Sequence, residues 1–429
     1  MEKQNAKSLM PTIAVIGGGA SGLLVVHQLF NEFKRLNQKN FKVLWFGKEK
    51  VFGLGAAYST KNKEHLLNVR TEGMSAFPDD PLHFWNWASK LQKIEKTSFL
   101  PRTLYGEYLQ ELIPHDLHLE QINEEVMEIH PIPIANKPGN KFECITINKV
   151  YLADYVVLAV GHLFPKKKPA EPNEISDISK IAEGSKVLFI GTGLTMVDGV
   201  LTLLSRDNPG KLTAISRRGL LPRVHSFYQK HSPTLKFEEW LKGENYSLRS
   251  SFKMMVEECQ NAMLNGSDWR SVFDLIRPKV PKIWSHFSTK DRKRFLRHVV
   301  RYWDIHRHRM APDVFQQLEN AKNSGTFQVI KGSLDQISKS DFDAIVDCRG
   351  LSMDIRACDS PLIQQLIQIK ILKLDDPSLG AQVGSEEIKN IDLVGPILRG
   401  RDWESIAIPE LRVQAKEAAV RVANWFSPP

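Results

Sequence analysis

Two glycine-rich turns are the parts of this chain whose residue types and spacing most clearly point to chemistry. The first, Gly17-Gly18-Gly19-Ala20-Ser21-Gly22, follows the apolar run 12–16 and precedes a helix-like segment over 23–33. In a G-x-G-x-x-G turn between strand and helix, Gly17 permits a tight turn, Gly19 lets a pyrophosphate approach the backbone, and Gly22 lets helix and strand pack closely. The helix N-terminus adds unpaired N–H donors. This turn therefore predicts a dinucleotide site.

The acidic residue that usually ends the second strand of such a unit, and binds the ribose hydroxyls, is displaced in this chain. The strand predicted over 41–46 is followed by Gly47 and Lys48, and Glu49 is the nearest carboxylate. Either Glu49 binds the ribose from a shifted position or another group does so.

A second, weaker turn lies at mid-chain. Gly191-Thr192-Gly193-Leu194-Thr195 follows a strand predicted over 186–190, and Met196 replaces the third glycine. The next predicted strand, 212–215, leads to Arg217 and Arg218, at the position where an acid would select NAD. Two guanidinium groups can hold a 2′-phosphate by bidentate bonds. We therefore expect NADPH rather than NADH, the alternative being a solvated basic turn.

Each turn has a later apolar strand that would close its sheet: 155–162, which contains Gly161, and 342–350. Two such units describe an α/β flavoprotein with two Rossmann-like three-layer dinucleotide-binding domains, with FAD at the first site and NADP at the second. The predicted organisation is an FAD-binding domain over 1–180 and 351–429, an NADP-binding domain over 181–220 and 323–350, and a helical insertion over 221–322.

Further motifs resemble those of bacterial FAD/NAD(P)-binding oxidoreductases related to flavin-dependent N-hydroxylating and Baeyer–Villiger monooxygenases. The resemblance runs nearly end to end. It is carried by the segments 53–59 (GLGAAYS), 65–69 (HLLNV), 74–81 (MSAFPDDP), 101–109 (PRTLYGEYL), 302–312 (YWDIHRHRMAP), 395–405 (GPILRGRDWES) and 409–415 (PELRVQA).

The resemblance and the local chemistry together assign more contacts to FAD. Glycines bring the backbone close to a ligand, the proline-containing loop 74–81 suits an ordered support under a flavin ring, Arg102 would meet a flavin phosphate or ring oxygen, and Val126 would lie in a short strand passing the adenine. The added FAD candidates are Gly53, Gly55, Tyr58, Asn68, Val69, Met74, Pro78, Asp79, Arg102, Tyr105, Val126, Gly161, Gly395 and Pro396.

The insertion carries the densest positive charge of the chain. Helices are predicted over 252–264, 269–276 and 290–302 by apolar spacing, and this region would cover the flavin and build the substrate pocket. A solvated helix face and a site for nucleotide phosphates or an anionic substrate are the competing interpretations. The pocket candidates are Trp303, Asp304, His306, Arg307 and Arg309. Arginines that alternate with His306 and His308 would repel a cation, so we expect no metal.

Composition and cysteine content argue against several other classes of protein. The chain has 429 residues, 42% of them apolar, and 58 basic against 49 acidic side chains give a net charge of +9. Four cysteines without a C-x-x-C pair argue against disulfides and against a dithiol flavoenzyme. The apolar run 12–16 breaks at Gly17 and 187–204 contains glycines and Asp198, so neither predicts a signal peptide or membrane span. We expect a cytoplasmic protein, with no recognised nucleic-acid motif and with an oligomeric state that the sequence leaves open.

The prediction is an FAD-dependent, NADPH-using oxidoreductase with a small-molecule substrate. The resemblance implies a monooxygenase that acts on a small amine or amino-acid-like compound through a flavin C4a-hydroperoxide. The alternatives are an NAD(P)H reductase or dehydrogenase without oxygen insertion, and a non-enzymatic FAD-binding redox sensor.

Overall fold

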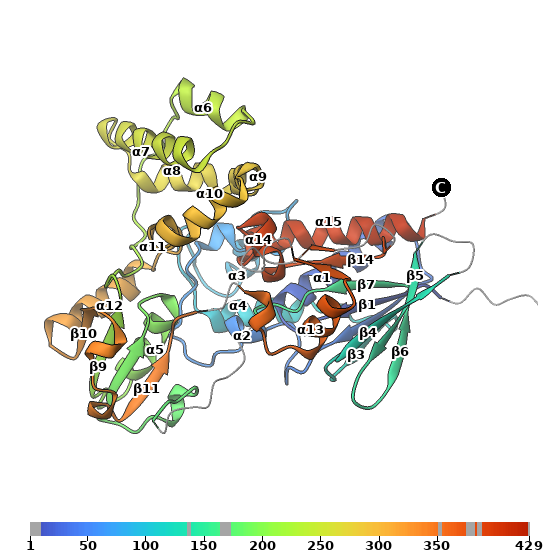
Figure 1. Ribbon diagram of the computed structural model, residues 1–429, viewed down its shortest axis with the longest axis horizontal. Helices are drawn as coiled ribbons and strands as arrows, with labels where there is room; N and C mark the ends of the chain where they lie inside the picture. The colour runs from blue at the N-terminus through green and yellow to red at the C-terminus, as the bar shows by residue number, and fades with distance from the viewer. Residues whose placement is uncertain are drawn as a thin grey trace, which may run out of the picture.

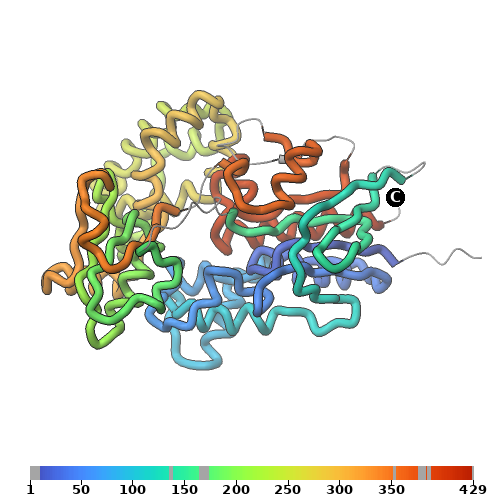
Figure 2. Tube along the Cα trace, turned by 60° about the horizontal axis from the view of Figure 1, so that its bottom comes forward, coloured from blue at the N-terminus to red at the C-terminus, as the bar shows by residue number. Residues whose placement is uncertain are grey.

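The first sheet of the protein is built from both ends of the chain (Figures 1 and 2). The structure, a computed structural model, describes residues 10–134, 139–163, 173–350, 354–374, 382–383 and 388–427; the predicted domain ends at 1, 351 and 429 lie outside them. All five strands of this sheet are parallel, with β1 at the centre. In spatial order they are β14 (Ile391–Leu393), β7 (Tyr155–Leu158), β1 (Thr12–Ile16), β2 (Lys42–Phe46) and β3 (Leu119–Ile122).

Both faces of this sheet are buried, which explains why its strands are apolar throughout rather than alternating. Ile13 and Val15 point into the cluster formed with the helices, whereas Ala14 and Ile16 point into the cluster on the other face. On the helical face lie α1 (Ala20–Arg35) and α15 (Ile408–Phe426), packed side by side, with α2 (Gly55–Tyr58), α3 (His83–Ala88) and α4 (Arg102–Glu111) beside them.

The opposite face is covered by an antiparallel sheet and one helix. These elements supply Phe142, Cys144 and Leu366 to the second cluster. They are β4 (Glu128–Pro133), β5 (Asn140–Ile145), β6 (Val150–Ala153) and α13 (Pro361–Gln368), next to the two-stranded pair β12 (Leu372–Lys373) and β13 (Gln382–Val383).

A second parallel sheet repeats the strand order of four strands of the first. In spatial order it contains β10 (Phe327–Lys331), β9 (Lys211–Ser216), β8 (Lys186–Ile190) and β11 (Ala344–Asp347). The helices α5 (Leu194–Leu204) and α12 (Pro312–Asn323) cover one face, and side chains of the segment 330–342 cover the other. The predicted α/β class with two dinucleotide-binding sheets is therefore confirmed.

Two domain boundaries differ from the prediction. The helix α12 packs Val314 and Leu318 against the second sheet, so the helical insertion ends near Met310 rather than at 322. Residues from Asn173 onward also join this sheet, because Ile175 and Asn173 form backbone hydrogen bonds with Ile345.

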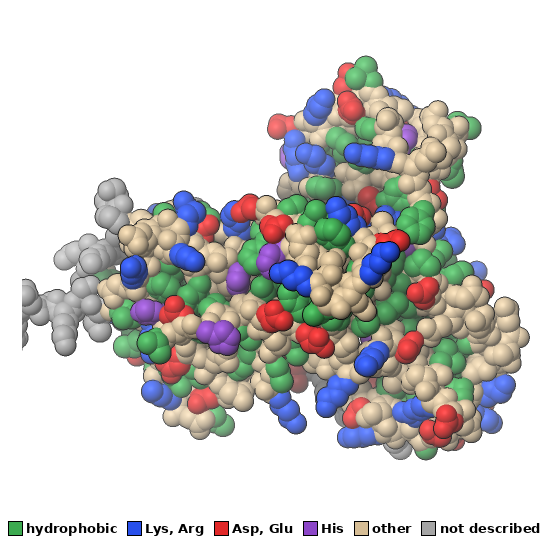
Figure 3. Space-filling model, turned by 180° about the vertical axis from the view of Figure 1, so that it is seen from behind, with side chains coloured by type: hydrophobic (Ala, Val, Ile, Leu, Met, Phe, Trp, Pro, Cys, Tyr) green, Lys and Arg blue, Asp and Glu red, His purple; other side chains and the backbone are tan. Residues whose placement is uncertain are grey.

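The regular elements of the insertion between β9 and α12 are helices, which follow an irregular segment over 217–234 and rise from the two sheets as a lobe (Figures 1 and 3). The predicted 269–276 helix forms with those bounds, 252–264 begins four residues earlier because Ser247 and Ser250 cap it reciprocally, and 290–302 forms as two helices joined by a π-helical turn, 295–299. Its helices are α6 (Leu235–Lys242), α7 (Leu248–Leu264), α8 (Trp269–Ile276), α9 (Val280–His286), α10 (Thr289–Arg294) and α11 (Val300–Arg307).

The lobe is fastened to the C-terminal segment. Trp284 Nε1–H donates to Gly400 O at 2.7 Å, in the short helix α14 (Arg399–Asp402), and Trp403 joins the apolar cluster of the lobe. In the part of the chain that the structure describes, we find no helix that combines the length and the hydropathy needed to traverse a bilayer.

Candidate functional site

The first glycine turn lies at the carboxyl end of β1 and has the geometry that the sequence predicts. Gly17 has φ of +130°, and a Cβ there would lie 2.1 Å from Ala159 O; a Cβ at Gly22 would lie 1.9 Å from Gly17 O. Gly19 is more open, since the nearest atom to its Cβ position is Gly55 Cα at 3.4 Å. Gly17 and Gly22 are thus required by packing, whereas Gly19 leaves room for a ligand at the N-terminus of α1, which has no side-chain cap.

Glu49 lies beside this turn. Its Oε2 would be 2.2 Å from a Cβ at Gly18 and 2.5 Å from one at Gly47, and the same oxygen is buried without a hydrogen-bond partner. Buried carboxylate oxygens are normally hydrogen-bonded, so this one fits a donor supplied by a ligand. An open glycine cradle with an unpartnered acceptor beside it suits the diphosphate and ribose of a dinucleotide such as FAD.

Four more predicted glycines lie at the same edge of the sheet. Gly53 N–H donates to Gly18 O at 2.7 Å, and Gly55 packs against Gly19. Gly395, with φ of +93°, follows β14 and lies against Ser21, while Gly161 follows β7 and has open space around its Cβ position. The segments before Tyr58 and Pro396 therefore converge on the glycine turn, as a shared ligand requires.

The loop 74–79 is ordered by contacts on several sides. Arg412 Nη1 donates to Ser75 O at 2.9 Å, Ser75 Oγ donates to Asp80 O, and Ala76 N–H donates to Tyr108 OH. Asp79 pairs with Lys416 of α15. Met74 is buried, whereas Asn68, Val69 and Pro78 are partly exposed, which leaves those three available to a ligand.

Three predicted FAD contacts have surroundings that the motifs did not indicate. Arg102 donates from Nη1 and Nη2 to the carboxylate of Asp198 in α5, at 2.7 and 3.1 Å, and so joins α4 to the second unit. Tyr105 is fully buried among Tyr58, Phe84 and Tyr108, and its hydroxyl has no hydrogen-bond partner. Val126 lies between β3 and β4, in neither strand.

The second glycine turn follows β8 and is more exposed. A Cβ at Gly191, which has φ of +115°, would lie 2.5 Å from Cys348 O, whereas Gly193 and Thr195 face open space and Leu194 begins α5. Met196 is fully buried in the core of this sheet, which explains how α5 packs without the third glycine.

The arginine pair follows β9, next to this turn. Arg217 is exposed, and the Arg218 guanidinium lies 4.9 Å from the Tyr302 ring centroid with Nη1 buried and without a partner. Two cations at this strand end, one with an unpartnered donor, fit an additional phosphate on the nucleotide.

The five pocket candidates of the insertion separate into three places. Trp303 and His306 line an apolar cavity inside the lobe. Asp304 lies 4.0 Å from Arg399, and Arg307 donates to Glu404 at 2.9 Å. Arg309 is 4% exposed and pairs with Asp274.

Oppositely charged side chains face each other at the contact between the insertion and the C-terminal segment. Arg277 binds Glu410 through Nε and Nη2, at 2.5 and 2.9 Å, and Arg307 lies 3.6 Å from the same carboxylate. Burial raises the pKa of Asp304 to about 6, and Arg399 opposes that shift. The exposed members of the basic run, Lys293, Arg294, Arg297 and Arg301, agree with a solvated helix face. The buried Arg307 and Arg309 contact carboxylates of the protein itself, and a site for nucleotide phosphates or an anionic substrate stays a prediction.

A junction that the sequence did not reveal joins the first unit to the insertion. His225 Nε2 donates to Asn68 O at 3.0 Å, and Arg70 Nη2 donates to Ser226 O at 2.8 Å. Desolvation, assisted by nearby Arg309, lowers the pKa of His225 to about 3, so its imidazole is neutral at pH 7. Beside it, Arg309 keeps Nε and Nη1 buried without partners. No motif marks these residues, because they meet only through tertiary packing.

The cysteines and the possible metal-ligating side chains do not form a further reactive site within the described residues. All four cysteines are free, and burial raises the pKa of Cys144, Cys259 and Cys348 to about 12. Within the described residues, no group of three or more His, Cys, Asp or Glu side chains is arranged to hold a metal ion.

Comparisons with known proteins agree with this geometry. A family model described as FAD-NAD(P)-binding matches residues 14–163. The uncharacterized protein YdhS of Escherichia coli strain K12 is 22% identical over 312 residues, which span 61% of this chain and 56% of that protein. The chain therefore spans little more than half the length of this relative.

Solved structures extend the likeness to almost the whole chain. An ornithine hydroxylase from Pseudomonas aeruginosa superposes with a TM-score of 0.60 at 14% identity, covering 97% of this chain and 100% of that one. A bacillithiol disulfide reductase from Staphylococcus aureus superposes with a TM-score of 0.55 at 14% identity, covering 97% and 99%. Residues 14–163 thus match the FAD-NAD(P)-binding family model, and the chain as a whole shares the α/β fold of the ornithine hydroxylase and of this reductase.

Proposed function

We propose that the protein is an FAD-dependent, NADPH-using monooxygenase that acts on a small amine or amino-acid-like substrate. The observation that carries the oxidoreductase part is the pair of glycine turns, each at the carboxyl end of a central parallel strand, with Glu49 beside one and Arg217 and Arg218 beside the other. The oxygenase part is supported by the likeness to the ornithine hydroxylase.

In this proposal the chain positions two nucleotides and one substrate. Gly19 and the N-terminus of α1 hold the FAD diphosphate, and Glu49 accepts from a ribose hydroxyl. Arg217 and Arg218 bind the 2′-phosphate of NADPH at the second turn. Bound FAD would supply hydride acceptance and oxygen activation, which the protein itself cannot provide.

Arg309 is our candidate for anchoring the substrate. Its guanidinium is buried, only part of it is used by Asp274, and two donors remain unpartnered. A carboxylate on the substrate would satisfy both donors by charge-assisted bonds. Neutral His225 next to it adds no competing charge at pH 7.

Isotope incorporation tests the oxygenase. Purified, FAD-loaded protein is given NADPH and ¹⁸O₂ with ornithine, lysine and simple diamines, and products are analysed by mass spectrometry. We expect one ¹⁸O atom per product and NADPH oxidation that requires oxygen. Hydrogen peroxide as the sole oxygen product with every amine would contradict the oxygenase.

A reductase is the second candidate, because the chain also superposes on a disulfide reductase. Stoichiometric oxidation of NADPH under argon, with a low-molecular-weight disulfide as acceptor, would support this alternative. The buried cysteines, with the raised pKa values of Cys144, Cys259 and Cys348, disfavour a protein dithiol as an intermediate carrier.

A further inference from the structure

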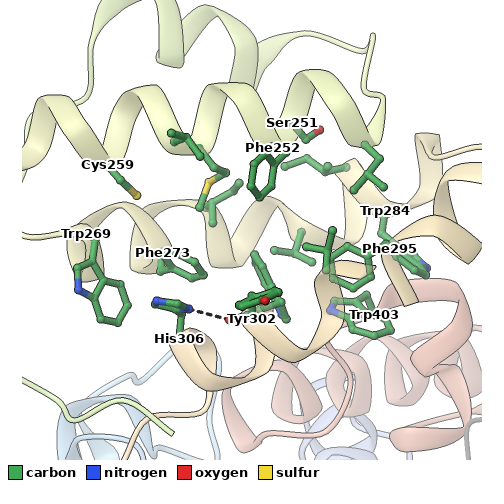
Figure 4. Close-up of a pocket in the computed structure, with 18 of the residues that line it drawn as sticks. Ser251, Phe252, Cys259, Trp269, Phe273, Trp284, Phe295, Tyr302, His306 and Trp403 are labelled. Atoms are coloured by element: carbon green, nitrogen blue, oxygen red, sulfur yellow. Dashed lines mark hydrogen bonds between the residues drawn. The ribbon is translucent and has the colours of Figure 1, made fainter. Parts of the chain in front are cut away.

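The helical lobe contains an apolar cavity of about 620 Å³ between α7 on one side and α8, α9 and α11 on the other (Figure 4). The helix α7 contributes one face to it, with Phe252, Met255, Val256, Cys259 and Met263 at helical spacing. A neighbouring face of α7, with Met254 and Ala262, packs against Phe237 of α6 and Val272 of α8. The volume falls within the range of about 300–1,000 Å³ that is typical of small-molecule sites.

The lining is almost free of charge. No Lys, Arg, Asp or Glu contributes to it, and its polar members are neutral groups such as Ser251, Gln260 and Tyr302. Desolvation lowers the pKa of His306, the one lining side chain that could titrate near neutrality. The remaining wall is mainly aromatic: Trp269, Phe273, Trp284, Phe287, Phe295 and Trp403.

Two polar atoms of lining residues lack partners. Trp303 Nε1 and Ser251 Oγ are buried without a hydrogen bond. Buried polar groups without a partner are unfavourable, so an occupant that carries an acceptor within reach of either atom is favoured. Phe252 and Tyr302, which also line the cavity, are 56% and 49% exposed, so a route from solvent exists at their side.

We propose that this cavity binds one uncharged, apolar organic molecule that carries a single hydrogen-bond acceptor, such as a medium-chain ketone, and that Trp303 Nε1 donates to that acceptor. A charged molecule is disfavoured, because burying an unpaired charge in such a lining is costly. This binding site is separate from both glycine turns and does not depend on the reaction proposed above.

Fluorescence titration of the FAD-loaded protein with N-phenyl-1-naphthylamine tests the site. We expect saturable one-to-one binding, together with a change in tryptophan emission because Trp269, Trp284, Trp303 and Trp403 line the cavity. In displacement, the ratio of the half-maximal concentrations of octan-2-one and octane gives the reference value, which contains the contribution of the buried donor. Octanoate should displace more weakly than octan-2-one.

Variants identify the cavity and the donor. Cys259→Trp fills the cavity and should weaken binding of the probe at least tenfold. Leu264→Trp, on the same helix but 84% exposed and outside the lining, should leave binding unchanged. Trp303→Phe keeps an aromatic ring without the N–H, so octan-2-one should lose about tenfold in displacement relative to octane. FAD content and NADPH oxidation report on folding in each variant.

Three results would overturn the inference. The first is equal binding of the probe to Cys259→Trp and Leu264→Trp. The second is an unchanged ratio of octan-2-one to octane displacement in Trp303→Phe. The third is a dimer in sedimentation analysis that Phe252→Glu separates, together with no probe binding by the native protein, which would make a second copy of this chain the occupant of this face.

Discussion

The ion pair between Arg102 and Asp198 provides a direct test of how the two dinucleotide-binding units are held together. Arg102 begins α4 on the first unit, and Asp198 lies in α5 on the second. The sequence motif suggested that Arg102 meets the flavin, whereas the structure commits its guanidinium to Asp198. Replacing each partner separately distinguishes the two roles, because a flavin contact would not depend on Asp198.

The burial and geometry of this ion pair set the expected loss in free energy of unfolding when it is removed. The side chains are 18% and 23% exposed, and the shorter N–O distance is 2.7 Å. At an effective dielectric constant of about 20, charges about 4 Å apart attract by about 4 kcal/mol, and desolvation reduces the net coupling to about 1–3 kcal/mol. Arg102→Gln alone should cost about 2–4 kcal/mol, since it also leaves a partly buried carboxylate unpaired.

Urea unfolding of the FAD-loaded protein, with flavin and tryptophan fluorescence as separate probes, measures this. Arg102→Gln, Asp198→Asn and the double variant form a cycle, and Lys42→Gln serves as the control. Lys42 pairs with Glu120 at 2.6 Å, but both side chains are exposed, at 41% and 45%, so the loss of this pair should cost under about 1 kcal/mol.

Two results would refute this assignment. A coupling below about 0.3 kcal/mol in the cycle would show that the pair does not join the units. Loss of bound FAD in Arg102→Gln but not in Asp198→Asn would return Arg102 to the flavin site.

The other predictions test the two nucleotide sites and one acid. The double variant Arg217→Ala, Arg218→Ala should weaken the binding of NADPH by about 1.5–3 kcal/mol and the binding of NADH much less. Equal losses of binding free energy for the two nucleotides in calorimetry would show that these arginines do not bind the 2′-phosphate. Gly19→Val should give protein without flavin, and a yellow, FAD-loaded variant would refute the pyrophosphate role. Asp304 holds its proton more tightly when folded, with a pKa of about 6 against 3.8. Stability should therefore fall as pH rises from about 4 to about 6, by at most about 3 kcal/mol, and Asp304→Asn should flatten that dependence in urea midpoints.

Features that rest on contiguous residues were predictable. The strands β1 and β8 occupy the residues expected from their apolar runs, since each is buried on both faces or by flanking segments. The first glycine turn could also be assigned residue by residue, because its steric demands arise within one strand–turn–helix unit: Gly22 is required by the carbonyl of Gly17, only five residues away.

Features that depend on contacts between residues far apart in the chain could not be predicted from the sequence. Arg102 finds its partner 96 residues later, and a basic residue in a motif gives no sign of which carboxylate will approach it. Val126 follows a strand without belonging to one, and α12 joins the second sheet through side chains that would suit either neighbour. The junction of Asn68 with His225 spans 157 residues and has no local signature.

The eight-residue helix α11 explains why its candidate residues could not be assigned to one pocket from the sequence. Successive residues on a helix point in different directions, so Trp303 faces the apolar cavity whereas Asp304 and Arg307 face Arg399 and Glu404. One short helix thus forms both the wall of the cavity and the charged contact with the C-terminal segment that follows Gly395. Because packed interiors transmit displacement, a ligand that shifts α11 from the cavity side must also act on that contact.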